Sequence, residues 1–116
     1  MSEWLTQRFG RIVIETAKLR DYCLSDIHPR GRHKARIFRS RLGWTAADAE
    51  LLRQVLVDAA RDRQDELRPA EADAYGRRFV LDFEIATAAG NATIRSAWIV
   101  LAGEDVLRFV TCYVLQ

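Results

Sequence analysis

The chain has 116 residues, a formal net charge of +2, 49% hydrophobic residues and 29% charged residues. This composition is typical of a globular protein and argues against intrinsic disorder, and no apolar run is long enough to span a membrane. The length predicts a single domain over residues 1–116, which can bury about 65% of its unfolded surface in one core.

The N-terminal sequence, MSEWLTQRFGRIVIE, lacks the uninterrupted apolar stretch of a signal peptide. Cys23 and Cys112 are the only cysteines, and two are too few for a disulfide framework. We expect them to be small buried thiols in a reducing compartment. These features predict a cytoplasmic location, with a domain cut from a longer secreted protein as the alternative.

The first half of the chain is predicted to be mainly helical. A short β-prone piece at 12–14 precedes helical spacing from about Glu15. After a loop, a second helix is predicted from about Arg32 to Leu42, with Gly43 as its C-terminal cap.

A third helix is predicted to open at Thr45 with the capping pattern TAAD and to continue to about residue 64. Residues 65–75 are polar and are predicted to form a loop. From Gly76 the apolar period changes to two, and two turns, AAGNA and GED, separate three strands. The fold class predicted is α+β, with N-terminal helices packed on a C-terminal antiparallel β-meander of three to four strands.

Alternation along these strands sorts the side chains into two faces. The face expected to pack on the helices takes Phe79, Leu81, Phe83, Ile85, Ala97, Ile99, Leu101, Val110, Cys112 and Val114. The opposite face takes Arg78, Asp82, Glu84, Ser96, Trp98, Thr111 and Tyr113. Two aromatic rings on adjacent strands of a polar face suit either sheet stabilisation or a binding surface.

Positive charge is concentrated in residues 28–41, HPRGRHKARIFRSR, which hold six of the eighteen Lys and Arg residues and both histidines. Removing these six charges from the net charge of +2 leaves −4 for the rest of the chain. The glycine loop leads into a helix start, where unpaired backbone N–H groups and basic side chains form a candidate anion site. This polarity predicts an anionic partner, with an ordinary solvated basic face as the alternative.

Two residues of this stretch are candidates for chemistry. Lys34 is predicted to lie about 60° from the centre of the helix's apolar stripe, so its ammonium group emerges at the edge of the core. His33 is the candidate base, because imidazole titrates near neutrality. A purely structural histidine is the alternative for His33, and Asp82 or Glu84 could be the base instead.

A metal site built from Cys23, His28 and His33 is not supported. The spacing C-x4-H-x4-H matches no standard zinc pattern, and six neighbouring cations would repel Zn²⁺. The chain also has no phosphate-binding glycine loop of the nucleotide kinds and no nucleophile elbow. We therefore predict no metal and no cofactor, and we regard His28 as the less constrained of the two histidines.

Five blocks of the sequence, spread over residues 18–114, resemble a family of small bacterial domains without an assigned function. The blocks are KLRDYCLS, HPRGRHKARIFRSRLGWTAADAELLR, YGRRFVLDF, IRSAWIV and LRFVTCYV. The order of helices and strands, ending in a strand with Thr and Tyr, is similar to the ribonuclease toxins of the barnase, EndoU, colicin and RelE-like superfamily.

The second resemblance implies that a basic residue or histidine of the helical part meets hydroxyl-bearing residues on the strands. Carried over by position, it implies catalytic roles for His33, Lys34, Thr111 and Tyr113. The chain departs from the superfamily in having no histidine on its strands, which leaves the acid–base assignment open.

These inferences predict a metal-independent ribonuclease, a bacterial toxin that cleaves RNA by attack of the 2′-hydroxyl. The expected partners are RNA, with tRNA and mRNA as candidates, and a cognate antitoxin or immunity protein, but no membrane. The basic helix argues against the chain being an immunity protein itself. The alternative is a non-catalytic RNA- or protein-binding module that uses the basic helix, residues 30–41. The predicted RNA-binding residues are Arg30, Arg32, Arg36, Arg39 and Trp98.

Overall fold

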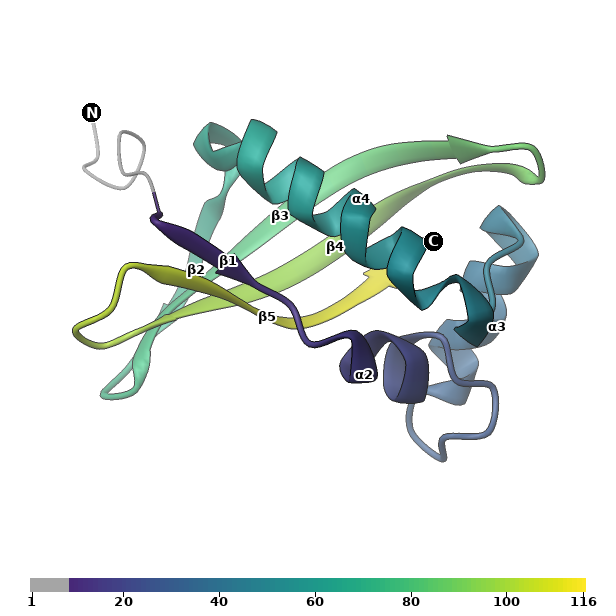
Figure 1. The fold of residues 1–116 in the computed structure, drawn as a ribbon, viewed down its shortest axis with the longest axis horizontal. Helices are drawn as coiled ribbons and strands as arrows, with labels where there is room; N and C mark the ends of the chain where they lie inside the picture. Colours follow the sequence, from purple (N-terminus) through teal and green to yellow (C-terminus); the bar gives the residue numbers. More distant parts are fainter. Residues whose placement is uncertain (1–8) are drawn as a thin grey trace.

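The computed structural model describes residues 9–116 as an α+β fold, in which helices lie between a first short strand and the remaining strands (Figure 1). The helical segments are α2 (Thr16–Lys18), the π-helical turn η1 (Leu19–Cys23), α3 (Arg32–Leu42), the short turn η2 (Ala46–Asp48), α4 (Ala49–Asp62) and the short turn η3 (Gln64–Glu66). The strands are β1 (Arg11–Val13), β2 (Arg68–Ala72), β3 (Gly76–Thr87), β4 (Gly90–Leu101) and β5 (Val106–Val114).

Within the described residues, five strands form one mixed sheet in the order β1-β5-β4-β3-β2. The predicted antiparallel meander is confirmed for β3, β4 and β5. It is incomplete, because β1 pairs in parallel with β5 and β2 pairs with β3. The expectation of a loop at 65–75 is therefore wrong. All five residues of β2 are exposed, so the strand lacks hydrophobic alternation, and its edge position tolerates Pro69.

The two longer helices begin and end close to where the sequence predicts. Gly43 ends α3 in the left-handed conformation (φ 74°), and its N–H donates to the Arg39 carbonyl at 2.9 Å. At the start of the next helical segment, the Thr45 hydroxyl accepts a hydrogen bond from the Ala47 N–H, and the Asp48 carboxylate accepts one from the Thr45 N–H. The capping pattern TAAD thus fixes the entry into η2 and α4.

The hydrophobic core lies between the helices and one face of the sheet. The helix α4 passes across the sheet (Figure 1) and buries Leu52 and Leu56. From the sheet, β3 contributes Phe79, Leu81 and Phe83, as predicted. The second long helix, α3, lies against β4 and β5 at one end of the sheet.

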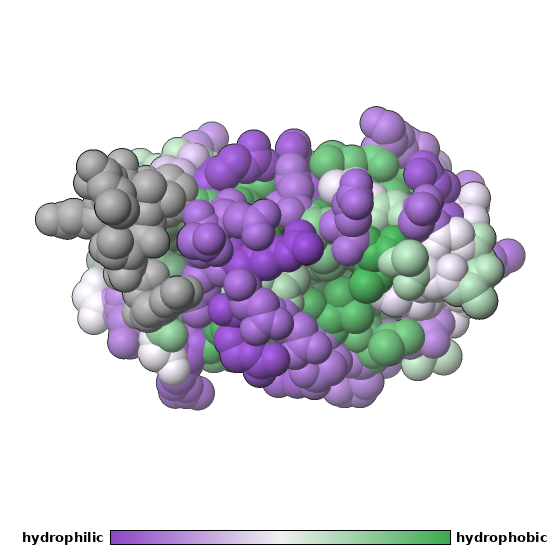
Figure 2. Space-filling view, turned by 90° about the horizontal axis from the view of Figure 1, so that it is seen from above, coloured by the Kyte–Doolittle hydropathy of each residue, from purple (hydrophilic) through white to green (hydrophobic). Residues whose placement is uncertain are grey.

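Part of this core is visible from outside. Seen from above, an apolar area lies among charged side chains (Figure 2). A groove between α4 and β3 is lined by the apolar residues Val55, Ala59, Phe83 and Ile85 and by the charged residues Asp58, Asp62, Arg63 and Glu84. The strand β2 pairs only with the first part of β3, so the second part of β3 has no further strand beside it among the described residues.

The predicted orientation of β4 is wrong. The core-facing residues of this strand are Ala92, Ile94, Ser96, Trp98 and Val100, and not Ala97, Ile99 and Leu101. Because β4 carries apolar residues in both phases, alternation alone cannot choose between them. The strand register decides: Trp98 pairs with Phe79 and Ser96 with Leu81, and directly paired residues share a face.

An irregularity in β5 changes which side chains face the core. Phe109 pairs with Trp98 and Thr111 with Ala97, so Val110 is an extra residue between two paired positions. Val110 is consequently 43% exposed, against the expectation that it faces the core. Cys112 is buried, as predicted. Such bulges re-aim neighbouring side chains, and here the bulge turns Thr111 to the face opposite the core.

Candidate functional site

The face of the sheet opposite the core carries rows of polar side chains, which we call the polar sheet face. Its residues are Asp82 and Glu84 on β3, Thr93 and Arg95 on β4, and Thr111 and Tyr113 on β5. The pairs Asp82–Arg95, Arg95–Tyr113 and Glu84–Thr93 are directly opposite each other in the register. Paired side chains in a sheet lie about 5 Å apart, so these groups form one continuous surface.

Lys34 reaches the polar sheet face from α3. Its ammonium nitrogen lies 4.6 Å from the centre of the Tyr113 ring, within the range of a cation–π interaction. Lys34 and Thr111 also line a common pocket of about 400 Å³ between η1, α3 and β5. The structure thus brings together three of the four predicted catalytic residues, Lys34, Thr111 and Tyr113.

The fourth predicted catalytic residue, His33, does not line this pocket. Its side chain is exposed on the first turn of α3. Consecutive residues of a helix differ by about 100° in direction, so His33 cannot point the same way as Lys34. Among the described residues, the His33 ring has no hydrogen bond or ion pair.

His28 has a structural role that the sequence analysis did not anticipate. Its Nδ1 accepts hydrogen bonds from the backbone N–H groups of Arg30 (3.0 Å) and Gly31 (3.1 Å). Its carbonyl accepts a third from the Arg32 N–H at 2.9 Å. The ring also packs edge-on against Tyr22, with 4.6 Å between centroids. Three N–H groups of the predicted anion site are therefore already satisfied by His28, which leaves less of that site than expected.

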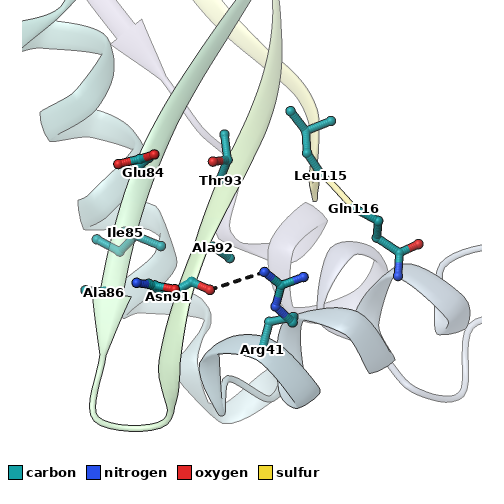
Figure 3. Close-up of a pocket in the computed structure, with 9 residues that line it drawn as sticks. All are labelled: Arg41, Glu84, Ile85, Ala86, Asn91, Ala92, Thr93, Leu115 and Gln116. Atoms are coloured by element: carbon teal, nitrogen blue, oxygen red, sulfur yellow. Dashed lines mark hydrogen bonds between the residues drawn. The ribbon is translucent and has the colours of Figure 1, made fainter.

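Glu84 lines an open depression at the far end of α3 (Figure 3). The depression measures about 540 Å³, and Arg41 and Thr93 also line it. The Arg41 guanidinium donates to the Asn91 carbonyl at 3.5 Å. Arg41 follows Lys34 by seven residues, two turns of a helix, so α3 presents both cations on the same side. The spacing of Lys34 and Arg41 can be read from the sequence, but only the structure shows that the sheet lies beside this side of α3.

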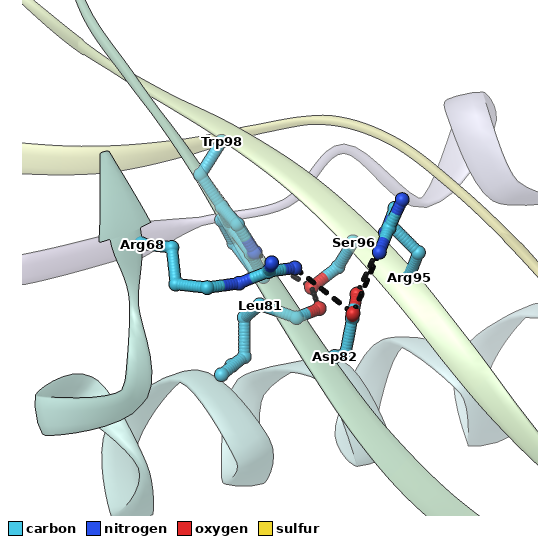
Figure 4. A network of polar contacts seen from close by, with 6 residues as sticks. All are labelled: Arg68, Leu81, Asp82, Arg95, Ser96 and Trp98. Atoms are coloured by element: carbon cyan, nitrogen blue, oxygen red, sulfur yellow. Dashed lines mark hydrogen bonds and ion pairs between the residues drawn. The ribbon is translucent and has the colours of Figure 1, made fainter. Parts of the chain in front are cut away.

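Asp82 is held by two arginines (Figure 4). Its carboxylate accepts two hydrogen bonds from Arg95 and one from Arg68, all at 2.9 Å. The hydrogen bonds from Arg95, and then the charges of both arginines, hold the pKa of Asp82 below its ordinary value against the effect of partial burial. Asp82 is thus a poor candidate for the base. The network instead orients Arg95, which the sequence analysis did not single out, beside Tyr113.

Trp98 cannot stack an RNA base, and its prediction as an RNA-binding residue is wrong. The side chain is 0% exposed and packs edge-on against Phe109 at 5.5 Å. Its indole N–H donates to the Ser96 hydroxyl at 2.8 Å, and that hydroxyl donates to the Leu81 carbonyl at 2.8 Å (Figure 4). The buried polar atoms of this pair are therefore satisfied within the core.

The predicted RNA-binding arginines form a separate surface. We use the term outer arginines for Arg30, Arg32, Arg36 and Arg39, all of which are exposed. Arg36 comes two residues after Lys34, about 200° further around the helix, and so points away from the polar sheet face. Within residues 9–116, the only ion pair that these side chains form joins Arg39 to Asp26 at 3.9 Å.

The fold and this surface define a class of protein: an α+β domain whose sheet has a polar face bordered by a basic helix. The chain belongs to the family described as a domain of unknown function, DUF6883, whose model matches residues 5–116. The expected membership in a family without an assigned function is thereby confirmed. Comparison with curated proteins found no match, and comparison with solved structures found none.

Among residues 9–116, no three His, Cys, Asp or Glu side chains gather in a way that could hold a metal ion. In the same part of the chain, no helix is both long and apolar enough to cross a membrane.

Proposed function

We propose that the protein is a metal-independent ribonuclease that acts at the polar sheet face. The observation that carries the proposal is the Lys34 ammonium group held over the Tyr113 ring, beside Thr111. Arg95, directly paired with Tyr113, supplies a second cation on the same surface. A partly enclosed cation, a second fixed cation and two hydroxyl groups suit the binding of a phosphodiester whose negative charge increases during reaction.

In the proposed reaction the 2′ oxygen of a ribose attacks the adjacent phosphorus, and the bond from phosphorus to the 5′ oxygen breaks. Glu84 accepts the proton from the 2′-hydroxyl, and Tyr113 gives a proton to the departing 5′ oxygen. Lys34 and Arg95 stabilise the charge on phosphorus, and Thr111 donates a hydrogen bond to a phosphate oxygen. The products are a 2′,3′-cyclic phosphate and a 5′-hydroxyl.

The position of Glu84 supports its assignment as the base. Its side chain is exposed on the polar sheet face and lines the open depression there. Within the described residues, its carboxylate has no ion pair, whereas that of Asp82 has two. His33 is the alternative base, because it is exposed on the same helix as Lys34.

The outer arginines would bind phosphates of the RNA beyond the cleaved bond. Exposed arginines bind phosphate groups without regard to base sequence, and this binding weakens with salt. We propose tRNA or mRNA as the substrate and the role of a toxin restrained by a cognate antitoxin or immunity protein. The exposure of the outer arginines also favours a second candidate, a non-catalytic RNA- or protein-binding module.

The test is RNA cleavage by the purified protein in excess chelator, with tRNA and an mRNA transcript as substrates. We expect cleavage products that end in a 2′,3′-cyclic phosphate, and no cleavage of RNA methylated at the 2′ oxygen. Glu84→Gln should lower the rate by about 10²–10⁴-fold, the usual contribution of general acid–base catalysis. His33→Ala tests the alternative base and should lower the rate much less. Salt-sensitive binding without any cleavage would favour the non-catalytic module.

A further inference from the structure

The chain's two cysteines come from distant parts of the sequence and meet beside the pocket that contains Lys34. Cys23 is the last residue of η1, and Cys112 lies in β5 between Thr111 and Tyr113. Both thiols are free and buried, with exposed fractions of 2% and 1%. The sulfur of Cys23 lies 3.9 Å from the Thr111 hydroxyl. The Cys23 sulfur therefore lies against the residue that precedes Cys112 in β5, which places the only two thiols of the chain in the same part of the fold.

The two thiols of this pair differ in acidity. Hydrogen bonding from the Cys112 thiol, the largest cause, lowers the pKa of Cys23 to about 7, and the positive charge of Lys34 acts in the same direction. Burial, the largest cause for Cys112, raises its pKa well above the ordinary value. Cys23 is thus the sulfur that ionises near neutral pH, and Cys112 keeps its proton and donates it in a hydrogen bond.

Access to this pair is restricted to small reagents. Cys23 belongs to the wall of the 400 Å³ pocket between η1, α3 and β5, and Lys18, Tyr22 and Val110 form other parts of that wall. Because almost none of the cysteine surface is exposed, a bulky disulfide reagent would be excluded, whereas hydrogen peroxide is small and uncharged. Lys34 at the same pocket would stabilise the negative charge that develops on the departing oxygen.

We propose that Cys23 and Cys112 form a peroxide-oxidisable thiol pair, in which Cys23 is attacked first and Cys112 resolves the product into a disulfide. In the first step the Cys23 thiolate attacks one peroxide oxygen, the O–O bond breaks, and the departing hydroxide takes a proton to become water. Cys23 is then a sulfenic acid. In the second step the Cys112 sulfur, losing its proton, attacks the Cys23 sulfur and releases the second water molecule. Two thiols are oxidised by two electrons, and one peroxide is reduced to two waters.

The disulfide would join η1 to β5 between Thr111 and Tyr113, so it would fix the strand that carries the polar sheet face. The oxidation itself does not depend on the proposed ribonuclease activity. It can therefore be tested on the full chain without any RNA substrate.

The test is to treat the reduced full-length protein with hydrogen peroxide near pH 7 and to follow its intact mass and its peptides. We expect a product lighter by two hydrogens, with a peptide cross-link between Cys23 and Cys112. Cys112→Ser retains a hydrogen-bond donor but cannot resolve, so its Cys23 sulfenic acid should persist and be trapped by dimedone that is added with denaturant after the peroxide has been removed. In the matched variant, Cys23→Ser, we expect Cys112 to react at least about tenfold more slowly, because thiolate content controls reactivity.

Three results would overturn the proposal. One is peroxide-treated protein with native circular dichroism in which no Cys23–Cys112 cross-link forms. The second is dimedone labelling of Cys112 in Cys23→Ser as fast as that of Cys23 in Cys112→Ser. A reaction that occurs only in denaturant would also count against it, because the fold would then have no part in pairing or activating the thiols.

Discussion

Trp98 and Tyr113 are two aromatic residues of neighbouring strands that lie on opposite faces of the same sheet. Trp98 is completely buried, and its one polar atom is hydrogen-bonded to Ser96 in the core. Tyr113 is only half-buried and lies beneath the Lys34 ammonium group. Both rings suit a binding surface when judged by residue type alone. Their surroundings assign a stabilising role in the core to Trp98, whereas Tyr113 stays partly exposed, and contact with a ligand is proposed for Tyr113 alone.

The same contrast holds for the positive charges of α3. Lys34 is packed over a ring, and its position is therefore fixed, whereas Arg36 and Arg39 are exposed at the surface of the helix. A fixed cation can stabilise charge that develops at one atom, because no reorganisation is needed during the reaction. Mobile exposed cations mainly attract an anion and are screened by salt. Under the proposed function, chemistry at the polar sheet face is therefore separate from attraction of RNA by the outer arginines.

Among the variants that test this comparison, the largest effect is expected from Lys34→Ala. Removing one preorganised cation should lower the single-turnover rate of RNA cleavage by about 10²–10³-fold, the usual cost of losing one transition-state stabilising group. Arg36→Ala, on the opposite side of the same helix, is the matched control and should change this rate by only a few-fold. Circular dichroism should show that both variants are folded. An equal loss of cleavage rate in the two variants would contradict the proposal that only the Lys34 side of α3 takes part in the reaction.

Trp98→Ala tests the other side of the sheet. Truncating a buried Trp typically costs about 3–5 kcal/mol of the free energy of unfolding, through lost apolar contacts and the cavity left behind. Denaturant unfolding measures this loss. Tyr113→Phe, which removes only a hydroxyl from the half-buried ring, should cost about 1 kcal/mol or less. A stable Trp98→Ala variant with weakened RNA binding would show that Trp98 is a surface residue after all.

The double variant Arg36→Ala/Arg39→Ala should weaken RNA binding and reduce its dependence on salt. Each phosphate contact contributes about 0.7 to the slope of log affinity against log salt for a single strand, so two lost contacts should lower the slope by about 1.4. Affinity measured by fluorescence anisotropy across a salt series tests this expectation. An unchanged slope would mean that the outer arginines do not contact phosphates.

The smallest effect is expected from Asp82→Asn, and it should depend on pH. The pKa of Asp82 is lower in the folded chain than in the unfolded chain, so the ionised carboxylate stabilises the fold above about pH 4. That contribution disappears as the pH falls through the folded-state pKa. Because the network is partly exposed, we expect a loss of about 1 kcal/mol at pH 7 and a smaller one near pH 3. Urea unfolding of both proteins at the two pH values measures the difference, and a pH-independent difference would contradict the ion-pair account.

Local signals in the sequence were sufficient for the helices. The Thr45 capping pattern and Gly43 mark helix boundaries by local hydrogen bonding and backbone conformation, which do not depend on distant residues. In contrast, β4 carries apolar side chains in both phases, so only its register with β3 buries Trp98 rather than Ile99. The strand β2 has no buried residue and exists because the edge of β3 is there to pair with.

In the candidate site, too, some features follow from the local sequence and others depend on contacts between strands. Helical spacing was enough to place Lys34 at the edge of the core, and alternation was enough to place Thr111 and Tyr113 on one face. Helical spacing and alternation could not show that the bulge at Val110 places Tyr113 and Trp98 on opposite faces of the sheet. They also could not show that Asp82 orients Arg95, because both features depend on contacts between strands.

The most direct test of the central claim is to map where RNA contacts the polar sheet face by NMR. A short oligonucleotide lacking 2′-hydroxyls serves as the probe, because it cannot be cleaved by 2′ attack. The account predicts that the Tyr113 ring and the methyl groups of Thr93 and Thr111 shift on titration, while those of Ile94 and Leu107 in the core stay in place. Shifts confined to the outer arginines, with the Tyr113 ring unchanged, would contradict it.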